Sequence, residues 1–291
     1  INFKIPEGEI LGLVGESGSG KTTLGRSIIR LIEPSAGEIL YNGKNIVDYS
    51  EKEMRTLRKD FQIIFQDPFA SLDPRKKIFN IISQGLKIHT NMNKQEIYDK
   101  VITITKDVGL QEEHLNRYPH EFSGGQRQRI GIARALVLDP KFIIADEPVS
   151  ALDVTIQAQI LSLILELKEK YSLTILFISH DLSVINQIAD RVMVMYLGHI
   201  VEVASTKNLF SNPKHPYTKS LIETAPQIFR TNKNKILLKG DIPSPINPPS
   251  GCVFRTRCPN PCVDCKEGNI EMGLIEIEHD HWVDQCCANC N

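Results

Sequence analysis

The feature that most constrains the fold is a glycine-rich segment between a predicted strand and a predicted helix. An apolar run, Ile10–Val14, predicts a buried strand, and a helical pattern runs from Lys21 to Leu31. The segment between them fits Gly-x-x-x-x-Gly-Lys-Thr in the structural context that this pattern requires. Its glycines let successive N–H groups point at an anion, and the helix N-terminus adds partial positive charge. We therefore predict a loop that binds the phosphates of a nucleoside triphosphate. The loop residues are Gly15, Glu16, Ser17, Gly18, Ser19, Gly20, Lys21, Thr22 and Thr23.

Two adjacent carboxylates end a second apolar strand. The run from Phe142 to Ala145 predicts this strand, and Asp146 and Glu147 follow it directly. In phosphate-loop ATPases the first carboxylate holds Mg²⁺, and a second one can polarise the attacking water as a general base. The alternative is that both acids merely cap the next helix, and the phosphate loop upstream makes this alternative the weaker one. Lys21 is expected to reach the β- and γ-phosphates.

Strands and helices alternate along most of the chain, which predicts an α/β fold on a mainly parallel, buried sheet. A turn signal at 6–9 predicts a short strand on either side of it, and Asn42-Gly43 predicts a hairpin within 38–47. Further strands are predicted at 61–65, 173–179 and 191–196, and a helix at 153–170. Residues 68–138 differ, because polar loops join three candidate helices there, at 76–88, 94–107 and 123–138. These helices predict a helical subdomain inserted in the α/β core.

Four further motifs occur in the order of a known family. Ser123, Gly124, Gly125 and Gln126 open the third candidate helix, where exposed amides would form a second anion site. At this point the sequence resembles the ATP-binding cassette (ABC) ATPases, in which Ser-Gly-Gly-Gln is the signature motif. Gln66 matches the Q-loop of that family, Asp153 matches the D-loop, and His180 matches the switch histidine.

The resemblance implies a RecA-like phosphate-loop core with an antiparallel β edge, and it assigns roles to the matching residues. Thr22, Gln66 and Asp146 would surround Mg²⁺. Glu147 would act as the general base, and His180 would contact the γ-phosphate. With Gln66, these two residues would form the catalytic set. The preference for ATP over other nucleotides comes from the family alone.

The resemblance also implies an assembly and a division into domains. Two cassettes would pair head to tail, with each ATP held between one phosphate loop and the partner's Ser123–Gln126 segment. The aromatic residue that stacks on adenine in this family lies further upstream than the 14 residues that precede Gly15 here. We therefore expect an N-terminally incomplete cassette over residues 1–205. Residues 206–291 then form a small cysteine-rich unit, the C-terminal extension.

The cysteines point to one branch of the family. All seven of them lie within the last 40 residues, so this region has its own chemistry. A proline-rich stretch at 242–249, which predicts a linker or a rigid lead-in, precedes them. The segment Gly251-Cys252 to Cys286 resembles the tail of the ATP-binding subunits of bacterial oligopeptide, dipeptide and nickel importers. His215-Pro216-Tyr217-Thr218 matches the same branch.

Thiolates are soft ligands that suit Zn²⁺ and iron–sulfur clusters. The resemblance points to a [4Fe–4S] cluster held by Cys252, Cys258, Cys265 and Cys286. Two alternatives stay open. One is a zinc site made by Cys262-x-x-Cys265 and Cys287-x-x-Cys290, since paired short spacings suit tetrahedral coordination. The other is a set of reduced thiols without a metal.

Composition and resemblance together define the expected partners. Lys and Arg number 34 and Asp and Glu number 35, so no basic excess indicates a nucleic-acid binder. No apolar run reaches the roughly 18 residues needed to span a bilayer. The resemblance implies a peripheral subunit on the cytoplasmic face of the bacterial inner membrane. Its partners would be a second ABC ATPase subunit, with a heterodimer favoured, two membrane permease subunits and, indirectly, an external solute-binding protein.

The expected function is ATP hydrolysis that powers the import of oligopeptides or dipeptides. The same motor could serve nickel or another small solute, because specificity lies in other subunits. A soluble ABC ATPase of DNA repair or translation is the alternative from another class. The 57 residues from Gln66 to Ser123 contain no heptad run, and only one cassette is present, so this alternative is disfavoured.

Overall fold

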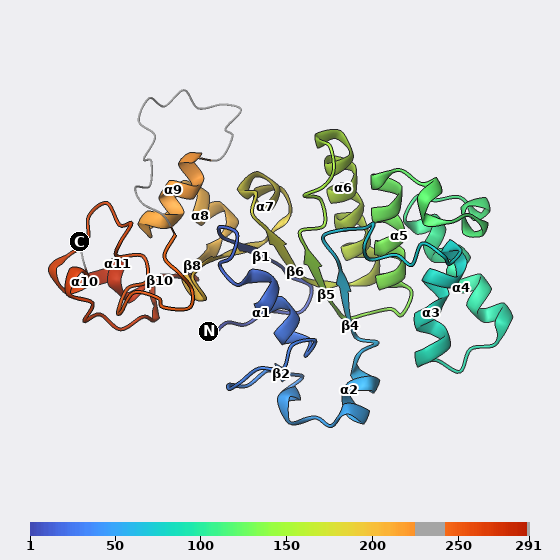
Figure 1. Ribbon diagram of the computed structural model, residues 1–291, viewed down its shortest axis with the longest axis horizontal. Coiled ribbons are helices and arrows are strands. Elements are labelled where there is room, and N and C mark those ends of the chain that lie inside the picture. Colours follow the sequence, from blue (N-terminus) through green and yellow to red (C-terminus); the bar gives the residue numbers. More distant parts are fainter. Residues whose placement is uncertain (225–241, 290–291) are drawn as a thin grey trace. The chain divides into compact units, whose positions relative to one another are not determined.

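The computed structural model describes residues 1–224 and 242–289, and its chain divides into two compact units. Unit 1 comprises residues 1–5, 10–22 and the described part of 177–291. Unit 2 comprises residues 6–9 and 23–176. The boundary between the units falls within β6 (Thr174–Ser179) and within α1 (Lys21–Ile28). Both elements are labelled in Figure 1.

Unit 1 contains one run of five hydrogen-bonded strands, in the order β1-β7-β8-β10-β9. The buried strand β1 (Ile10–Val14) pairs in parallel with β7 (Arg191–Tyr196). The remaining pairs are antiparallel and join β7, β8 (His199–Ser205), β10 (His281–Asp284) and β9 (Leu274–Glu278). Because β10 pairs with β8, the strands β10 and β9 form the antiparallel edge of this run.

The helices of unit 1 are short. They are α7 (Leu182–Ile188), α8 (Thr206–Ser211), α9 (Pro216–Thr224), α10 (Val263–Glu267) and α11 (Gln285–Asn289). One of them packs closely on β1, because a Cβ at Gly12 would lie 2.8 Å from Ile185 in α7. A side chain at position 12 would therefore push this helix off the strand.

Unit 2 places helices beside a second parallel pair of strands. The strand β4 (Phe61–Ile64) pairs in parallel with β5 (Phe142–Asp146), which is buried along its whole length. The helices are α2 (Glu51–Leu57), α3 (Ile78–His89), α4 (Lys94–Asp107), α5 (Gly124–Leu136) and α6 (Val154–Tyr171). Short 3-10 helices lie at Ile46–Asp48, Glu112–Asn116 and Pro119–Glu121.

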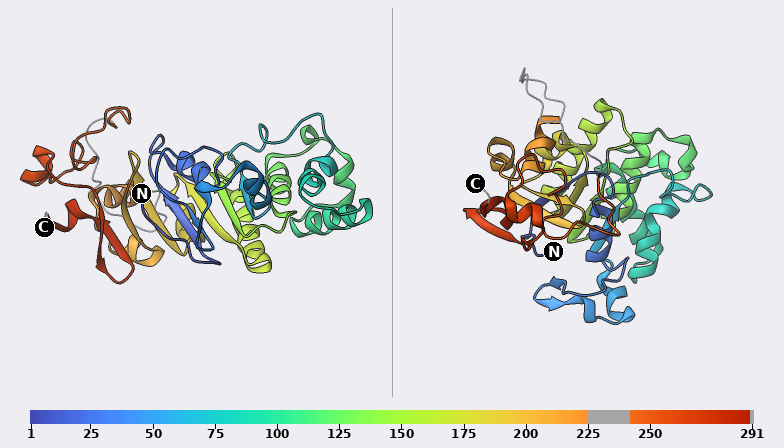
Figure 2. Two further views of the ribbon diagram at one scale, coloured as in Figure 1. Left: turned by 90° about the horizontal axis from the view of Figure 1, so that it is seen from below. Right: turned by 60° about the vertical axis from the view of Figure 1, so that its left-hand side comes forward.

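The three helices α3, α4 and α5 form one packed group, which both views of Figure 2 show in cyan and green. Their apolar faces meet in a core that contains Ile82, Leu86, Val101 and Ile130, each at most 1% exposed. A capping box in which Asn93 and Glu96 take part fixes the start of α4. This group is the predicted helical subdomain.

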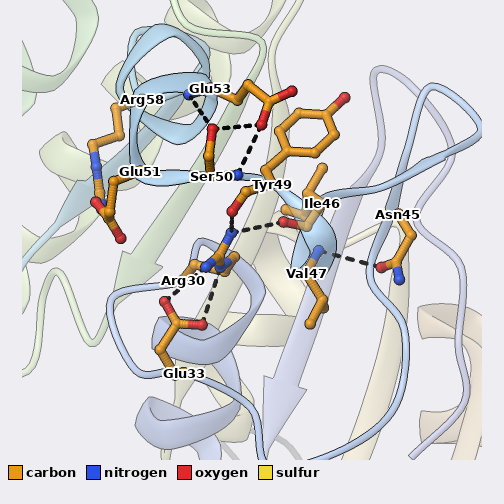
Figure 3. Close-up of polar contacts among 10 residues, drawn as sticks. All are labelled: Arg30, Glu33, Asn45, Ile46, Val47, Tyr49, Ser50, Glu51, Glu53 and Arg58. Atoms are coloured by element: carbon orange, nitrogen blue, oxygen red, sulfur yellow. Dashed lines mark hydrogen bonds and ion pairs between the residues drawn. The ribbon is translucent and has the colours of Figure 1, made fainter.

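The first part of unit 2 is held by polar contacts around Arg30 (Figure 3). The Arg30 guanidinium donates to the carbonyls of Ile46 (2.9 Å) and Tyr49 (2.6 Å) and pairs with Glu33 (3.0 Å). Ser50 then caps α2 through a reciprocal pair of hydrogen bonds with Glu53. The half-buried Arg30 therefore ties the end of α1 to the chain that leads into α2.

Most of the predicted elements are confirmed. The strands β4, β5, β6 and β7 and the helices α3 to α6 lie within a few residues of their predicted positions. The hairpin joins β2 (Leu40–Tyr41) to β3 (Lys44–Asn45) through Asn42 and Gly43, both at positive φ. The expected strand before the turn at 6–9 is absent, since residues 1–6 carry no regular structure. Among residues 1–224 and 242–289, no helix combines the length and apolarity that crossing a bilayer requires.

Candidate nucleotide site and cysteine cluster

The phosphate loop follows β1 and ends in the first turn of α1, and all of it except Thr23 lies in unit 1. Gly15 has a φ of +157°, and a Cβ there would lie 2.1 Å from the carbonyl oxygen of Met195, so only glycine fits. Lys21 is 5% exposed, and its ammonium donates to the carbonyls of Gly15 (2.7 Å) and Glu16 (3.0 Å). The lysine that the sequence assigns to the phosphates is thus already folded over the loop.

Among the remaining loop residues, one is buried and two adjacent ones are exposed. Ser19 is 4% exposed, and its carbonyl accepts the N–H of Gly198 (2.9 Å) in the turn after β7. Ser17 and Gly18 are exposed, and Gly18 has a φ of +80°. The exposed backbone together with the start of α1 can surround an anion, which is how helix N-termini bind phosphates.

His180 also lies in unit 1, directly after β6. Its side chain is exposed, while the following Asp181 caps α7 by accepting the N–H of Ser183 (2.8 Å). The cap fixes the backbone at the histidine, so the ring projects from a defined point at the end of a buried strand.

Gln66 and Glu147, from the Q-loop and the end of β5, meet in unit 2. The Gln66 amide donates to the Glu147 carboxylate at 2.9 Å, although 81 residues separate them. Glu147 has a φ of +47°, a left-handed conformation that is uncommon for a residue with a side chain. Such backbone strain is concentrated at functional sites. A carboxylate held by an amide at a strand end can accept a proton from water.

Asp146, the preceding residue, is 1% exposed at the end of β5. The Arg26 guanidinium of α1 lies 3.7 Å from its carboxylate. Carboxylate oxygens are hard ligands of the kind that suit Mg²⁺. Thr22 is half-buried at the start of α1. Its hydroxyl oxygen is also a hard donor.

The signature segment forms the start of α5. The Ser123 hydroxyl accepts the N–H of Gln126 (3.4 Å), and the Gln126 side chain accepts the N–H of Ser123 (3.0 Å). Gly125 approaches α6 so closely that a Cβ would lie 2.5 Å from Ile156. Asp153 of the D-loop caps α6 by accepting the N–H of the same Ile156 (3.0 Å). The signature and the D-loop are therefore packed against each other at two adjacent helix starts.

Three of the four predicted cluster ligands come together in unit 1. The sulfur atoms of Cys252, Cys265 and Cys286 all lie within 4.8 Å of one another, and all three residues are buried. Cys265 and Cys286 are only 2.8 Å apart at sulfur. Cys258 is half-buried and lies outside this group of three. We call Cys252, Cys265 and Cys286 the cysteine cluster.

The alternative zinc set is not assembled in the described residues. Cys262 is disulfide-bonded, so its sulfur is not a thiolate ligand. Cys290 lies outside the described residues, and Cys287 is a half-buried free thiol.

The surroundings of the cysteine cluster raise the thiol pKa values. For Cys252 the main cause of the raised pKa is a hydrogen bond with Cys286, followed by burial. Burial is the main cause for Cys265, whose pKa is also raised. Neutral thiols must lose their protons to bind a metal, so metal binding here releases protons. Several buried thiols with converging sulfur atoms fit the donor set of zinc or an iron–sulfur cluster.

A buried carboxylate supports this region. Glu202 in β8 is fully buried and accepts the N–H of Lys214 (2.8 Å), the N–H of His215 (2.9 Å) and Nε2–H of His281 (2.8 Å). Burial by itself would raise the pKa of Glu202, but these hydrogen bonds lower it below its ordinary value. The carboxylate therefore joins β8, the turn before α9 and β10.

Glu202 and Arg26 were not predicted from the sequence. The sequence around Glu202 resembles that of an exposed strand residue. The groups that donate hydrogen bonds to its carboxylate lie 12 to 79 positions away along the chain. Arg26 lies on the first helix after the phosphate loop, one turn from Thr22, and this spacing is a signal that could have found it.

Comparisons with known proteins agree with this geometry. Residues 1–150 match the ABC transporter family, and residues 201–265 match the C-terminal region of oligopeptide/dipeptide transporters. Among solved structures, CbiO1 from Clostridium perfringens, part of an ABC transporter complex, has a TM-score of 0.67 at 32% identity. It covers 73% of this chain and 83% of its own. A dimeric bacterial ABC transporter cassette has a TM-score of 0.64 at 30% identity, with 71% and 89% covered.

Curated relatives are similar over most of their length. A putative peptide import ATP-binding protein of Brucella ovis is 56% identical over 89% of this chain and 82% of its own. The oligopeptide transport ATP-binding protein AppF of Bacillus subtilis is 53% identical, with 92% and 82% covered. OppF of Haemophilus influenzae is 54% identical, with 89% and 79% covered. The chain thus belongs to the ABC transporter family of ATPases and carries the C-terminal region found in oligopeptide and dipeptide transporters.

Proposed function

We propose that this chain is the ATP-hydrolysing subunit of a bacterial importer for oligopeptides or dipeptides. The names of the relatives AppF and OppF and the match of residues 201–265 support peptides over nickel as the solute. The observation that carries the proposal is the 2.9 Å hydrogen bond from Gln66 to Glu147, because it positions a carboxylate for general-base chemistry.

The chemistry assigns a separate task to each residue. The loop from Gly15 to Thr23 binds the phosphates through its amides, and Lys21 moves from the loop carbonyls to the β- and γ-phosphates. Thr22, Asp146 and Gln66 would hold Mg²⁺, which would offset part of the negative charge of the phosphates.

Glu147 accepts a proton from the attacking water, and the Gln66 amide orients the carboxylate for this step. His180 contacts the γ-phosphate from the end of β6. The signature residues Ser123 to Gln126 present the start of α5 to a nucleotide bound by a second ABC subunit. The reciprocal hydrogen bonds within that segment support this task, because they hold its backbone ready before the partner arrives.

The second subunit would be a related ATPase rather than an identical chain. Asp153 lies beside the signature segment in the chain's own fold, which supports a role for the D-loop at the same interface. Two membrane permease subunits and an external solute-binding protein complete the proposed importer, and they place this chain as a peripheral subunit on the cytoplasmic face of the membrane. The boundary at residue 205 between cassette and extension remains part of this proposal.

We also propose that the extension holds a metal centre, a [4Fe–4S] cluster or zinc, through Cys252, Cys265 and Cys286, with Cys258 as the fourth ligand. The convergence of three buried sulfur atoms supports the first three ligands. Protein purified without oxygen is expected to contain iron with visible absorbance, or zinc without it. Cys252→Ser should lose the metal and Cys287→Ser should keep it. Metal-free protein with all cysteines intact would contradict the proposal.

The test of hydrolysis is Glu147→Gln. This variant keeps the size of the side chain and is expected to lower ATP turnover by at least about 100-fold while ATP binding persists. It should also accumulate an ATP-bound dimer, because the nucleotide is no longer cleaved. Glu166→Gln is the matched control, since Glu166 lies exposed on α6. Undiminished turnover in Glu147→Gln would remove Glu147 from this role.

The test of the solute is uptake by cells. Cells that lack this chain should lose uptake of a labelled tripeptide and regain it with the intact chain but not with Glu147→Gln. Nickel uptake should be unchanged in all three. Loss of nickel uptake with intact peptide uptake would assign the motor to the other solute.

A further inference from the structure

Two residues of the C-terminal extension contact the second residue of the phosphate loop. The Tyr217 hydroxyl accepts the N–H of Glu16 at 2.8 Å. The Arg257 guanidinium donates to both carboxylate oxygens of Glu16, at 2.7 Å and 3.2 Å. Glu16 is thus held at its amide and at its carboxylate by residues that follow it by 201 and 241 positions.

These contacts are largely shielded from solvent. The Arg257 side chain is 7% exposed and that of Glu16 is 26% exposed. Two-pronged pairing of a guanidinium with a carboxylate fixes the orientation of both groups, which a lysine cannot do. A partly buried pair of this geometry is screened little by salt.

A buried aromatic group supports both partners of Glu16. The rings of Tyr196, Tyr217 and Phe254 are each at most 1% exposed, and their centroids lie 4.8 to 5.5 Å apart. The Arg257 guanidinium lies 5.9 Å from the ring of Tyr196. Phe254 and Arg257 belong to one turn, in which the N–H of Arg257 donates to the carbonyl of Phe254 at 3.0 Å.

The position of Glu16 matters to the nucleotide because Lys21 donates to its carbonyl at 3.0 Å. A shift of Glu16 would therefore move an acceptor of the lysine that reaches the phosphates. Neither Tyr217 nor Arg257 belongs to the loop itself, and both contact it at Glu16.

We propose that Tyr217 and Arg257 are positioning residues that hold the phosphate loop in its nucleotide-binding conformation through Glu16. This pair, the Glu16 clamp, makes the C-terminal extension a working part of the nucleotide site. The inference rests on the proposed ATP site and adds residues to it that lie outside the cassette motifs.

The experiment measures binding of a fluorescent trinitrophenyl-ATP and the ATPase KM and kcat of the full chain. Arg257→Ala is expected to weaken nucleotide binding and to raise KM by about tenfold, with kcat changed little, because the clamp orients the loop and touches no reacting atom. Tyr217→Phe removes only the hydroxyl and keeps the ring packing, so it should give a smaller change of the same kind. Arg257→Lys should lie between Arg257→Ala and the intact chain.

Arg255→Ala is the matched control. Arg255 lies on the same turn, but its guanidinium donates to the carbonyl of Lys266 (2.9 Å). It should bind nucleotide like the intact chain. Equal losses in Arg255→Ala and Arg257→Ala would show a general effect of the turn and overturn the clamp.

A double-variant cycle separates the clamp from the loss of a positive charge near the phosphates. Glu16→Gln and Arg257→Gln each break the same pair, so the double variant should lose no more affinity than the worse single one. Additive losses would mean that Arg257 acts only through its charge, and the clamp would be wrong.

Lys21→Ala distinguishes failure of the clamp from failure of the ATP site. If Lys21→Ala abolishes binding and Arg257→Ala binds normally, the clamp alone is wrong. If Lys21→Ala binds normally, the proposed ATP site itself is wrong.

Discussion

The phosphate loop and the cysteine cluster are two sites that are built in different ways. The loop is one continuous segment of nine residues, and its anion-binding groups are largely its own backbone amides. The cluster draws its three sulfur atoms from positions 252, 265 and 286, which three separate segments bring together. A site made by consecutive residues can be recognised from spacing alone, whereas a site made by distant residues depends on the packing that joins its segments.

Glu202 illustrates that dependence. It joins β8 to β10 and to the turn before α9, and β10 leads directly into the helix that carries Cys286. The phosphate loop does not depend on a single buried charge in this way. Its conformation is defined by its glycines and by the start of α1. Substitutions in the phosphate loop and at Glu202 should therefore have different effects, on ATP turnover and on folding stability respectively.

The largest effect is expected at the local site. Lys21→Ala should lower ATP turnover by more than about 100-fold, because the phosphates lose their only loop ammonium. Folding should be intact, since the loop backbone remains. Lys219→Ala, at an exposed position of α9, is the control and should leave turnover unchanged. Steady-state ATPase rates with a thermal melt of each variant check this, and substantial turnover in Lys21→Ala would refute the phosphate-loop assignment.

A stability effect is expected at the assembled site. Glu202→Gln leaves a neutral amide facing three donors in a buried position, which should destabilise the fold by about 2–4 kcal/mol. Denaturant unfolding followed by the fluorescence of Trp282 in β10 measures it. Glu278→Gln removes an exposed partner of Lys214 and should give no measurable change. A stable Glu202→Gln would mean that this carboxylate does not hold the region together.

The same carboxylate predicts a pH dependence with a definite sign. The folded-state pKa of Glu202 is lowered from 4.5, so its contribution to stability is complete above that value and is lost as pH falls through the lower, folded-state pKa. Melting temperatures between pH 7 and pH 3 should therefore fall more steeply in the intact chain than in Glu202→Gln. Parallel curves would exclude Glu202 as a source of the acid sensitivity.

The smallest effects are expected within the cassette, at two glycines of α5. Gly125→Ala would place a Cβ 2.5 Å from Ile156 and should destabilise by about 1–3 kcal/mol. Gly131→Ala meets no atom within 4 Å and should stabilise the helix by about 0.5–1 kcal/mol. Unfolding free energies of the two variants check the opposite signs. If both variants destabilised equally, the close approach of α5 and α6 would not be the cause.

Much of the cassette could be predicted because its signals are local. The run Phe142 to Ala145 is apolar enough to identify a buried strand, and Asn42-Gly43 is a strong signal for a tight hairpin. The strand β8 was missed, because its buried Glu202 interrupts the apolar pattern. The fourth expected ligand, Cys258, could not be judged from spacing, since a turn between Cys252 and Cys265 decides where its sulfur lies.

Contacts between side chains that are distant in the sequence could not be predicted either. The hydrogen bond from Gln66 to Glu147 joins two motifs that were recognised separately. Arg257 had no signal at all, because an arginine in a turn is ordinary until its partner Glu16 is known.

The left-handed backbone of Glu147 has a consequence for how this chain can change. A glycine at this position would adopt the same backbone angles without steric cost, and relief of such strain amounts to about 1 kcal/mol or more. That exchange would stabilise the backbone and would remove the carboxylate that we propose as the general base. At this position, the residue that best stabilises the backbone therefore differs from the residue that the proposed hydrolysis requires.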